Sequence, residues 1–316
     1  MANHSGHGMI QAGTNARALK ISAWLTGIYF LIELAIGFYT GSVAVISDAF
    51  HTFSAVGGVV LAIVAARIAR RPADKERTFG SLRAEIVGAL LNGAFLLAMA
   101  ILVLVMGYMR LQNPIDLPTA PMFLAAVGGL ITEVISLRLL YAGQKGDLNV
   151  KGAFWHIIQT FVGSILIIVT ALVIEFTGFL AIDPILGMVF GVVLLYASWG
   201  IMRDATNILM EGAPSDIDLR RVVDQLEALP DVNDVHHVHA WTLTSNKHVF
   251  SAHLRAVDTM VAPKVLKEAH DLLRNEFGFH LATLQIETVC LDEDHAKELD
   301  FLSDAVLIGK HTSESP

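Results

Sequence analysis

Long apolar runs alternate with short polar connections up to about residue 202. A membrane-spanning helix needs about 20 mostly apolar residues, and six segments meet this requirement. They run over residues 21–40, 43–66, 84–109, 119–142, 152–176 and 182–202. The pattern predicts a six-helix membrane domain over residues 21–207. A flexible polar arm, residues 1–20, is expected before it, without the apolar core of a cleavable signal peptide.

The pattern changes after about residue 208, where charged residues become frequent and the apolar spacing turns short. Helical spacing and strand-like alternation follow each other in the order α-β-β-α-β. The expected elements are residues 218–229, 232–243, 247–257, 262–277 and 282–289. This order predicts a small cytoplasmic domain over residues 208–292, with helices on one side of a three-stranded sheet. A tail, residues 293–316, is expected after it.

Composition supports the membrane assignment and excludes several classes of protein. Hydrophobic residues make up 54% of the chain and charged residues only 16%, against about 25% charged in a soluble domain. The net charge of −8 argues against nucleic acid as a partner. The single cysteine, Cys290, excludes an internal disulfide and a Cys-rich zinc module. No nucleotide-binding motif, catalytic triad or paired-acid active site occurs, so we do not expect an enzyme.

Lysine and arginine are distributed unevenly between the two sides of the predicted membrane domain, and this sets the orientation. One side of the domain carries a single basic residue, Arg110, near the acidic residues Asp116, Glu175 and Asp183. The other side carries Arg17, Lys20, Arg67, Arg70, Arg71, Lys75, Arg77, Arg83, Lys145, Lys151 and Arg203. We therefore expect both termini in the cytoplasm, in a multi-pass protein of a bacterial inner (plasma) membrane.

Several ionisable side chains fall inside the predicted spans, where they are costly and usually functional. These residues are Glu33, Asp48, His51, Glu133, Arg138 and His156. They can be structural, because buried polar side chains also bond between helices and fix their register. Two histidines and acids on three spans favour a polar pathway for a cation instead. Imidazole nitrogen and carboxylate oxygen suit divalent transition metals such as zinc.

Stretches along almost the whole chain resemble the cation diffusion facilitator family of zinc/cadmium/cobalt–proton antiporters. The stretches are GSVAVISDAFHTFSAVGG (41–58), RRPADKERTFGSLRAEIVGALLNG (70–93), DLNVKGAFWHIIQTFVGS (147–164), IDPILGMVFGVVLLYAS (182–198), ILMEGAP (208–214), DVHHVHAWTLTSNKHVFSAHL (234–254) and TLQIE (283–287). The resemblance implies six spans, a metallochaperone-like αββαβ domain and a homodimer. It also implies a metal site between spans 2 and 5, with proton entry driving metal out.

The chain departs from the ligand pattern that the resemblance implies. Family members carry His-or-Asp-xxx-Asp in span 2 and His-xxx-Asp in span 5, so that two helices supply four ligands. This sequence has His51 followed by Ala55, and His156 followed by Thr160. Both histidines are present and both aspartates are replaced. A divalent ion on two neutral imidazoles would keep its full charge in a low-dielectric setting.

Three explanations of this departure stay open at the level of the sequence. Nearby acids can substitute: Glu33 and Asp48 match acids of the family, whereas Glu133 stands where the family more often has asparagine. Glu133 could instead pair with Arg138. A second explanation is a loose site in which water, Gln159 or Thr160 are weak ligands for a less discriminated cation. The third is loss of transport, which would leave a membrane metal sensor or dimer scaffold.

Histidines are also frequent in the predicted cytoplasmic domain. Strand alternation places His237 and His239 on one face and His236 on the other. Matched to the metal site that the resemblance implies at a dimer interface, the candidate ligands are His236, His253, His270 and Glu287. The alternative is a set of surface histidines on a solvated domain.

The function we predict is export of a divalent transition-metal cation, most simply zinc, in exchange for protons. The candidate ligands within the membrane are His51, His156, Asp48, Glu133, Glu33 and Thr160. The expected partners are a second copy of the chain, the lipid bilayer, the divalent metal and the proton. The alternatives are the non-transporting sensor or scaffold and a carrier of another cation.

Overall fold

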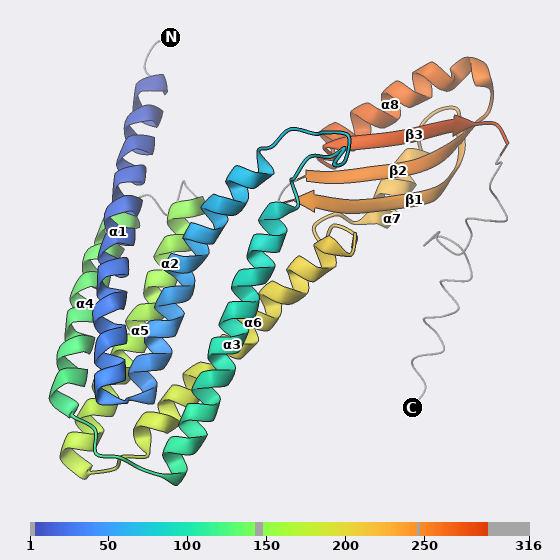
Figure 1. The fold of residues 1–316 in the computed structure, drawn as a ribbon. Helices are drawn as coiled ribbons and strands as arrows, with labels where there is room; N and C mark the ends of the chain where they lie inside the picture. The colour runs from blue at the N-terminus through green and yellow to red at the C-terminus, as the bar shows by residue number, and fades with distance from the viewer. Residues whose placement is uncertain (1–3, 143–147, 245–246, 290–316) are drawn as a thin grey trace. The chain divides into compact units, whose positions relative to one another are not determined.

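The structure is a computed structural model that describes residues 4–142, 148–244 and 247–289 (Figure 1). The chain forms two compact units, residues 1–67 with 87–203 and residues 68–86 with 204–316. The first unit contains long helices and the second contains the three-stranded sheet. The predicted tail, residues 293–316, and Cys290 lie outside the described residues.

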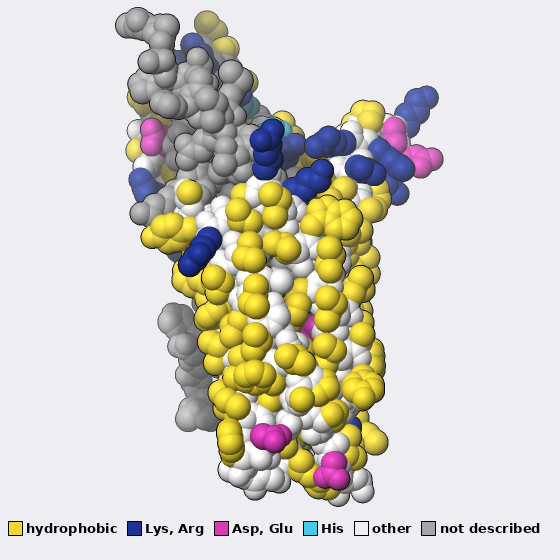
Figure 2. Space-filling view, turned by 90° about the vertical axis from the view of Figure 1, so that its left-hand side faces the viewer, with side chains coloured by type: hydrophobic (Ala, Val, Ile, Leu, Met, Phe, Trp, Pro, Cys, Tyr) yellow, Lys and Arg dark blue, Asp and Glu magenta, His cyan; other side chains and the backbone are white. Residues whose placement is uncertain are grey.

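The first unit is built from helices in the places that the apolar runs predict. Their bounds are α1 His4–Thr40, α2 Val43–Ala69, α3 Ala84–Gln112, α4 Thr119–Tyr141, α5 Leu148–Thr177 and α6 Ile182–Leu209. Among the described residues, five are long and apolar enough to cross a membrane, and α2 contributes a shorter apolar stretch, Val60–Ala69. The flank of this unit is covered by hydrophobic side chains, as a lipid-facing surface requires (Figure 2).

Two boundaries differ from the predicted ones. Helix α1 begins at His4, so its helical backbone extends upstream of the apolar segment into the arm predicted to be flexible. Residues 68–86, predicted to belong to the membrane domain, group with the C-terminal unit. Contacts within that unit explain the second difference. Arg83 Nη2 lies 2.8 Å from Glu211 Oε1, and Thr244 Oγ1 donates to Glu85 Oε2 at 2.6 Å.

Small and apolar side chains pack the helices of the first unit together. Helix α4 packs against α1 and α5. One buried cluster joins the first turn of α2 to α4 and α5, through Ala44, Val45, Met122, Ala126, Ile167 and Ala171. A second joins α1, α4 and α5 through Ala18, Leu140 and Ile157, and a third joins α3 and α6 through Leu96, Ala100 and Leu194. Polar residues between these clusters are thereby held away from lipid.

The second unit has the predicted order α-β-β-α-β. Its elements are α7 Leu219–Glu227, β1 Val232–Thr244, β2 Lys247–Ala256, the short helix η1 Thr259–Val261, α8 Ala262–Asn275 and β3 Leu281–Glu287. The sheet order is β1-β2-β3, with β1 and β2 antiparallel and β2 and β3 parallel. Helices α7 and α8 cover one face around a core that includes Leu226, Phe250, Leu254 and Leu273. This arrangement confirms the predicted open-faced sandwich.

Candidate metal sites

Three acidic side chains from three helices meet inside the first unit. Glu33 of α1, Asp48 of α2 and Glu133 of α4 are 0%, 2% and 6% exposed. Glu33 and Asp48 lie next to each other, and Glu133 is close enough to interact electrostatically with both. Carboxylates this close repel one another when they are all ionised. A cation, or protons, among them would remove that repulsion.

The two intramembrane histidines lie together, with His51 one turn after Asp48 on α2 and His156 one turn before Thr160 on α5. The ring centroids of His51 on α2 and His156 on α5 are 4.9 Å apart, with an angle of 40° between the ring planes. The Nε2 atom of each ring is buried and has no hydrogen-bond partner within the described part of the chain. Sequence reasoning reached this proximity only through the family resemblance, because periodicity along one helix says nothing about its neighbours.

Glu133 lies beside the position where the ligand pattern lacks its aspartate. Thr160 follows His156 by one helical turn, and its hydroxyl lies against the Glu133 carboxylate while it donates to the Ile157 carbonyl at 3.0 Å. Ser164, one turn further, donates to Glu133 Oε1 at 2.9 Å. The Oε2 atom is buried without a hydrogen-bond partner among the described residues. A carboxylate from α4 therefore stands next to Thr160 of α5.

The structure also shows how other residues considered for this site lie. Within the described residues Glu133 makes no ion pair with Arg138, so the internal pair considered from the sequence is not formed. Gln159 is exposed on α5, whereas Thr160 is buried. Ala55 lies on α2 one turn after His51, and its side chain lies outside the described part of the structure.

A glycine that the sequence did not single out allows the close approach of α2 and α5. A Cβ atom at Gly163 would lie 2.6 Å from Asp48 Cγ. Any other residue at this position would push the Asp48 carboxylate aside. Gly129 on α4 has a similar role, since a Cβ there would lie 2.6 Å from Tyr29 Oη and 2.7 Å from Ser164 Oγ. Neither glycine belongs to a spacing pattern that marks ligands, so sequence reasoning missed both.

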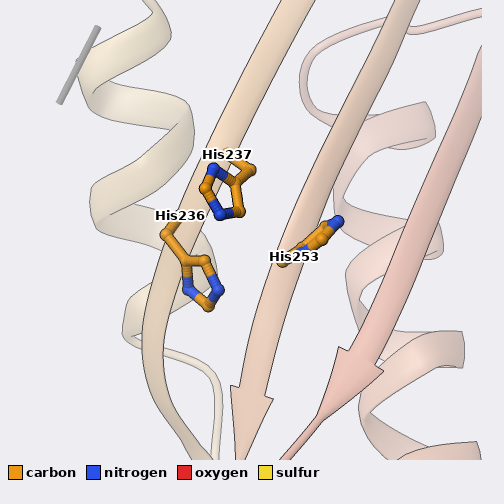
Figure 3. A group of neighbouring side chains, drawn as sticks. All are labelled: His236, His237 and His253. Carbon is orange, nitrogen blue, oxygen red and sulfur yellow. The ribbon is translucent and has the colours of Figure 1, made fainter. Parts of the chain in front are cut away.

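A second cluster lies on the sheet of the other unit. His236, His237 and His253 each offer a ring nitrogen within 4.8 Å of the others, from strands β1 and β2 (Figure 3). His236 Nε2 is 2.7 Å from Glu287 Oε1, and His253 Nδ1 is 3.5 Å from Glu287 Oε2. Three imidazoles and one carboxylate are a ligand set that zinc accepts.

His237 joins this cluster because β1 contains a bulge. The pairing of β1 with β2 shifts between His236 and His239, and His237 has a positive φ of 51°. The extra residue breaks the alternation of side chains. The predicted placement of His236 and His237 on opposite faces is therefore wrong. His239 remains on an exposed position.

His270, predicted as a fourth ligand, does not join the cluster within one chain. It lies on α8, where its Nδ1 is 2.9 Å from the Leu266 carbonyl oxygen and its Nε2 is 3.2 Å from the Ala282 carbonyl oxygen. Both nitrogens therefore face backbone acceptors rather than the other imidazoles. Of the four residues predicted there, the structure brings together His236, His253 and Glu287.

Carboxylates face both ring nitrogens of His236. His236 Nδ1 is 2.9 Å from Asp234 Oδ2, so both ring nitrogens face acceptor oxygens, and a neutral ring can donate to only one of them. Burial raises the pKa of Glu287, but hydrogen bonds from Gln285 and His236 and the nearby His253 outweigh it. The pKa of Glu287 therefore lies below its ordinary value.

The fold and these clusters define a class: a helical membrane protein with a buried cluster of acids and histidines and a small sheet domain. Comparison with known proteins agrees. Residues 19–210 match the cation efflux transmembrane domain, and residues 214–289 match the cytoplasmic domain of cation efflux proteins. The chain belongs to the cation efflux, or cation diffusion facilitator, family.

Relatives of the chain include bacterial metal efflux proteins. The chain is 38% identical over 308 residues to the metal cation efflux system protein CzcD of Cupriavidus metallidurans, covering 96% of both chains. It is 31% identical over 275 residues to the zinc transporter ZitB of Escherichia coli, covering 86% of this chain and 88% of that protein. A cadmium, cobalt and zinc/H(+)-K(+) antiporter of Bacillus subtilis is 29% identical over 289 residues, covering 90% of this chain and 93% of that protein. The chain is thus a metal cation efflux protein and not an enzyme.

Proposed function

We propose that the protein exports a divalent transition metal, zinc foremost, from the cytoplasm in exchange for protons. The names of the relatives support these ions, since they include a zinc transporter and a cadmium, cobalt and zinc/H(+)-K(+) antiporter. The observation that carries the proposal is the Glu133 carboxylate, which lies against Thr160 beside the paired rings of His51 and His156.

The charges of the cluster support a divalent ion. Two neutral imidazoles would leave the full charge of the ion uncompensated in a medium of low dielectric constant. Glu133 supplies a carboxylate at the place where the replaced aspartate would stand, and Asp48 supplies one from α2. His51, His156, Asp48 and Glu133 are then the proposed ligands, with Glu33 as a neighbouring charge and Thr160 as a hydrogen-bond partner of Glu133.

Exchange for protons follows from the same ligands. A metal ion binds deprotonated imidazole and carboxylate groups, so protons compete with it for the same atoms. When the site faces a more acidic compartment, protons replace the metal, and the protonated site then returns. The positive charge on one side of the membrane domain supports an orientation with both termini in the cytoplasm.

We propose a regulatory role for the cytoplasmic unit, in a homodimer. Its match to the cytoplasmic domain of cation efflux proteins supports this role. The clustering of His236, His237 and His253 beside Glu287 supports metal binding there. A zinc ion needs its nitrogen ligands at about 2.0–2.1 Å, so the rings would move slightly together around it.

Transport by the purified full-length chain in liposomes tests the proposal. With a pH-sensitive dye inside, we expect zinc uptake driven by an imposed proton gradient, accompanied by proton movement in the opposite direction. His156→Ala should abolish uptake, whereas Gln159→Ala, on an exposed position of the same helix, should leave it unchanged. Cadmium, cobalt, manganese and iron are compared in the same assay.

The outcomes separate the alternatives. If no metal is transported while zinc still binds to the cytoplasmic unit, the protein is a sensor or scaffold. Uptake of several cations at similar rates would indicate a loose site. Normal uptake by His156→Ala would contradict the assigned ligands.

A further inference from the structure

The buried carboxylate of Asp183 ties the beginning of α6 to the beginning of α2. Asp183 is the second residue of α6 and is 0% exposed. It accepts a hydrogen bond from the Ser42 hydroxyl, one from the Val43 amide at 2.8 Å and one from the Ala44 amide at 3.2 Å. The first amides of a helix have no partners within the helix. In α2 the Val43 and Ala44 amides bond instead to Asp183, which lies 140 and 139 positions further along the chain.

Two further contacts hold the same helix ends together. One turn along α6, a Cβ at Gly187 would lie 2.9 Å from the carbonyl carbon of Val43 and 3.0 Å from the Ala44 nitrogen. Only glycine permits this approach of the two backbones. Arg110, near the end of α3, places its guanidinium beside Gly41 and interacts electrostatically with Asp183. The cation compensates the buried carboxylate.

We propose that Asp183 is a positioning residue that keeps the first turn of α2 fixed to α6 throughout the transport cycle, so that α2 moves by tilting about this end. The proposal rests on the proposed transport function. It goes beyond that function because it assigns the fixed point of the helix that carries Asp48 and His51.

The geometry of a helix fixed at one end gives the two ligands different movements. With a rise of about 1.5 Å per residue, Asp48 lies about 7.5 Å and His51 about 12 Å beyond Val43. A tilt of about 10° would then move Asp48 by about 1.3 Å and His51 by about 2.1 Å. The ligand further from the tie moves more, so His51 can separate from His156 while Asp48 stays near Gly163.

The other contacts of the first turn of α2 differ in chemistry from its hydrogen bonds to Asp183. The contacts of the first turn of α2 with α4 and α5 are apolar, and apolar surfaces can slide without leaving a polar group unpaired. Separation of Asp183 from α2 would leave a buried carboxylate and two buried amides without partners. Each buried group left unsatisfied carries the full cost of its desolvation. The hydrogen bonds from the first turn of α2 to Asp183 are therefore the last contacts of α2 to break.

Amide hydrogen exchange of the full-length protein in lipid nanodiscs tests the tie without any transport measurement. We expect the Val43 and Ala44 amides to stay protected both without metal and with saturating zinc. In Asp183→Asn, which keeps the size of the side chain but loses one acceptor, exchange should speed up by roughly tenfold or more. The start of α4 is an internal reference, because Pro118 offers no side-chain cap. Loss of protection on addition of zinc, or unchanged exchange in the variant, would overturn the proposal.

Transport kinetics separate a positioning role from a general structural one. Asp183→Asn should lower the maximal zinc transport rate by roughly fivefold or more, with the dissociation constant for zinc unchanged. Ser42→Ala, which removes one of the three bonds, should have a smaller effect in the same direction and replaces Asp183→Asn if that variant does not fold. Asp116→Asn, an exposed carboxylate at the same end of the helices, is the matched control.

The remaining outcomes decide between the positioning role of Asp183 and the transport function on which it rests. A folded Asp183→Asn protein with a normal rate, or with a rate and an affinity that fall together, would overturn the positioning role. If the wild-type chain moves no metal, the transport function fails, and the exchange measurement still decides whether the tie persists.

Discussion

Glu133 of α4 lies against Thr160 of α5, and in the proposed site it supplies the carboxylate that α5 lacks. Glu133→Gln keeps the hydrogen bond from Ser164 but removes the charge. We expect zinc affinity to fall by about tenfold or more, because charged ligands and their hydrogen bonds contribute about 1.5–3 kcal/mol each. Calorimetric titration of zinc into the purified protein measures the change.

The same pair allows a restoring variant. Adding Thr160→Asp to Glu133→Gln should return affinity to near the wild-type value, because a carboxylate again lies one turn after His156. Glu175→Gln, an exposed carboxylate that contacts Thr119, is the control and should leave affinity unchanged. If the double variant binds zinc no better than Glu133→Gln, Glu133 does not stand in for the missing aspartate.

The pKa of Glu287 predicts how the stability of the cytoplasmic unit depends on pH. Because the folded-state pKa lies below the ordinary value of 4.5, the stabilisation is complete above that value and is lost as the pH falls through the lower one. In Glu287→Gln the loss of stability between about pH 6 and about pH 3 should be smaller. Urea unfolding followed by Trp241 fluorescence, with the other three of the four tryptophans replaced by phenylalanine, measures it.

Glu276→Gln gives the control for that measurement, since Glu276 is exposed at the end of α8. Its pH dependence should match the wild-type protein. Equal curves for Glu287→Gln and the wild type would show that the hydrogen bonds from Gln285 and His236 do not bias the carboxylate toward its ionised form.

At the scale of elements, the close contact of α2 and α5 depends on Gly163. Gly163→Ala places a methyl group 2.6 Å from Asp48 Cγ, so the carboxylate or the helix must shift. We expect a loss of about 1–3 kcal/mol in stability, together with weaker zinc binding, measured by thermal unfolding and calorimetry. Gly200→Ala on α6 meets no atom within 4 Å and should be neutral or stabilising by up to about 1 kcal/mol. A Gly163→Ala protein with normal stability and affinity would contradict the contact.

The elements themselves could be predicted from the sequence because each one follows a simple period. Apolar runs gave the long helices, and alternation gave the three strands. The site was predictable where family spacing or an unexpected charge marks a residue, as at His156 and Glu133. His237 was not, because a bulge changes the direction of side chains without any glycine or proline to signal it. Gly163 was not, because a close contact between helices depends on both of them.

The orientation of the membrane domain is a prediction that can be tested at its connections. Six predicted spans would place both ends of the chain on one side, and the bias of lysine and arginine predicts that this side is the cytoplasm. Alkaline phosphatase fused in the connection between α3 and α4, residues 113–118, should be active, because the predicted orientation puts that connection outside the cell. Green fluorescent protein fused after residue 289 should fluoresce, because the same orientation keeps it inside.

The positive charges that predict this orientation can be tested directly. Arg67, Arg70, Arg71, Lys75, Arg77 and Arg83 lie in or next to the connection between α2 and α3. Replacing them by glutamine while adding lysines to residues 113–118 should reduce phosphatase activity at that connection and increase it at the C-terminus. Replacing the five arginines among them by lysine keeps the charge and serves as the control. Phosphatase activity at the C-terminus of the wild-type chain would contradict cytoplasmic termini, and with them the proposed direction of metal export.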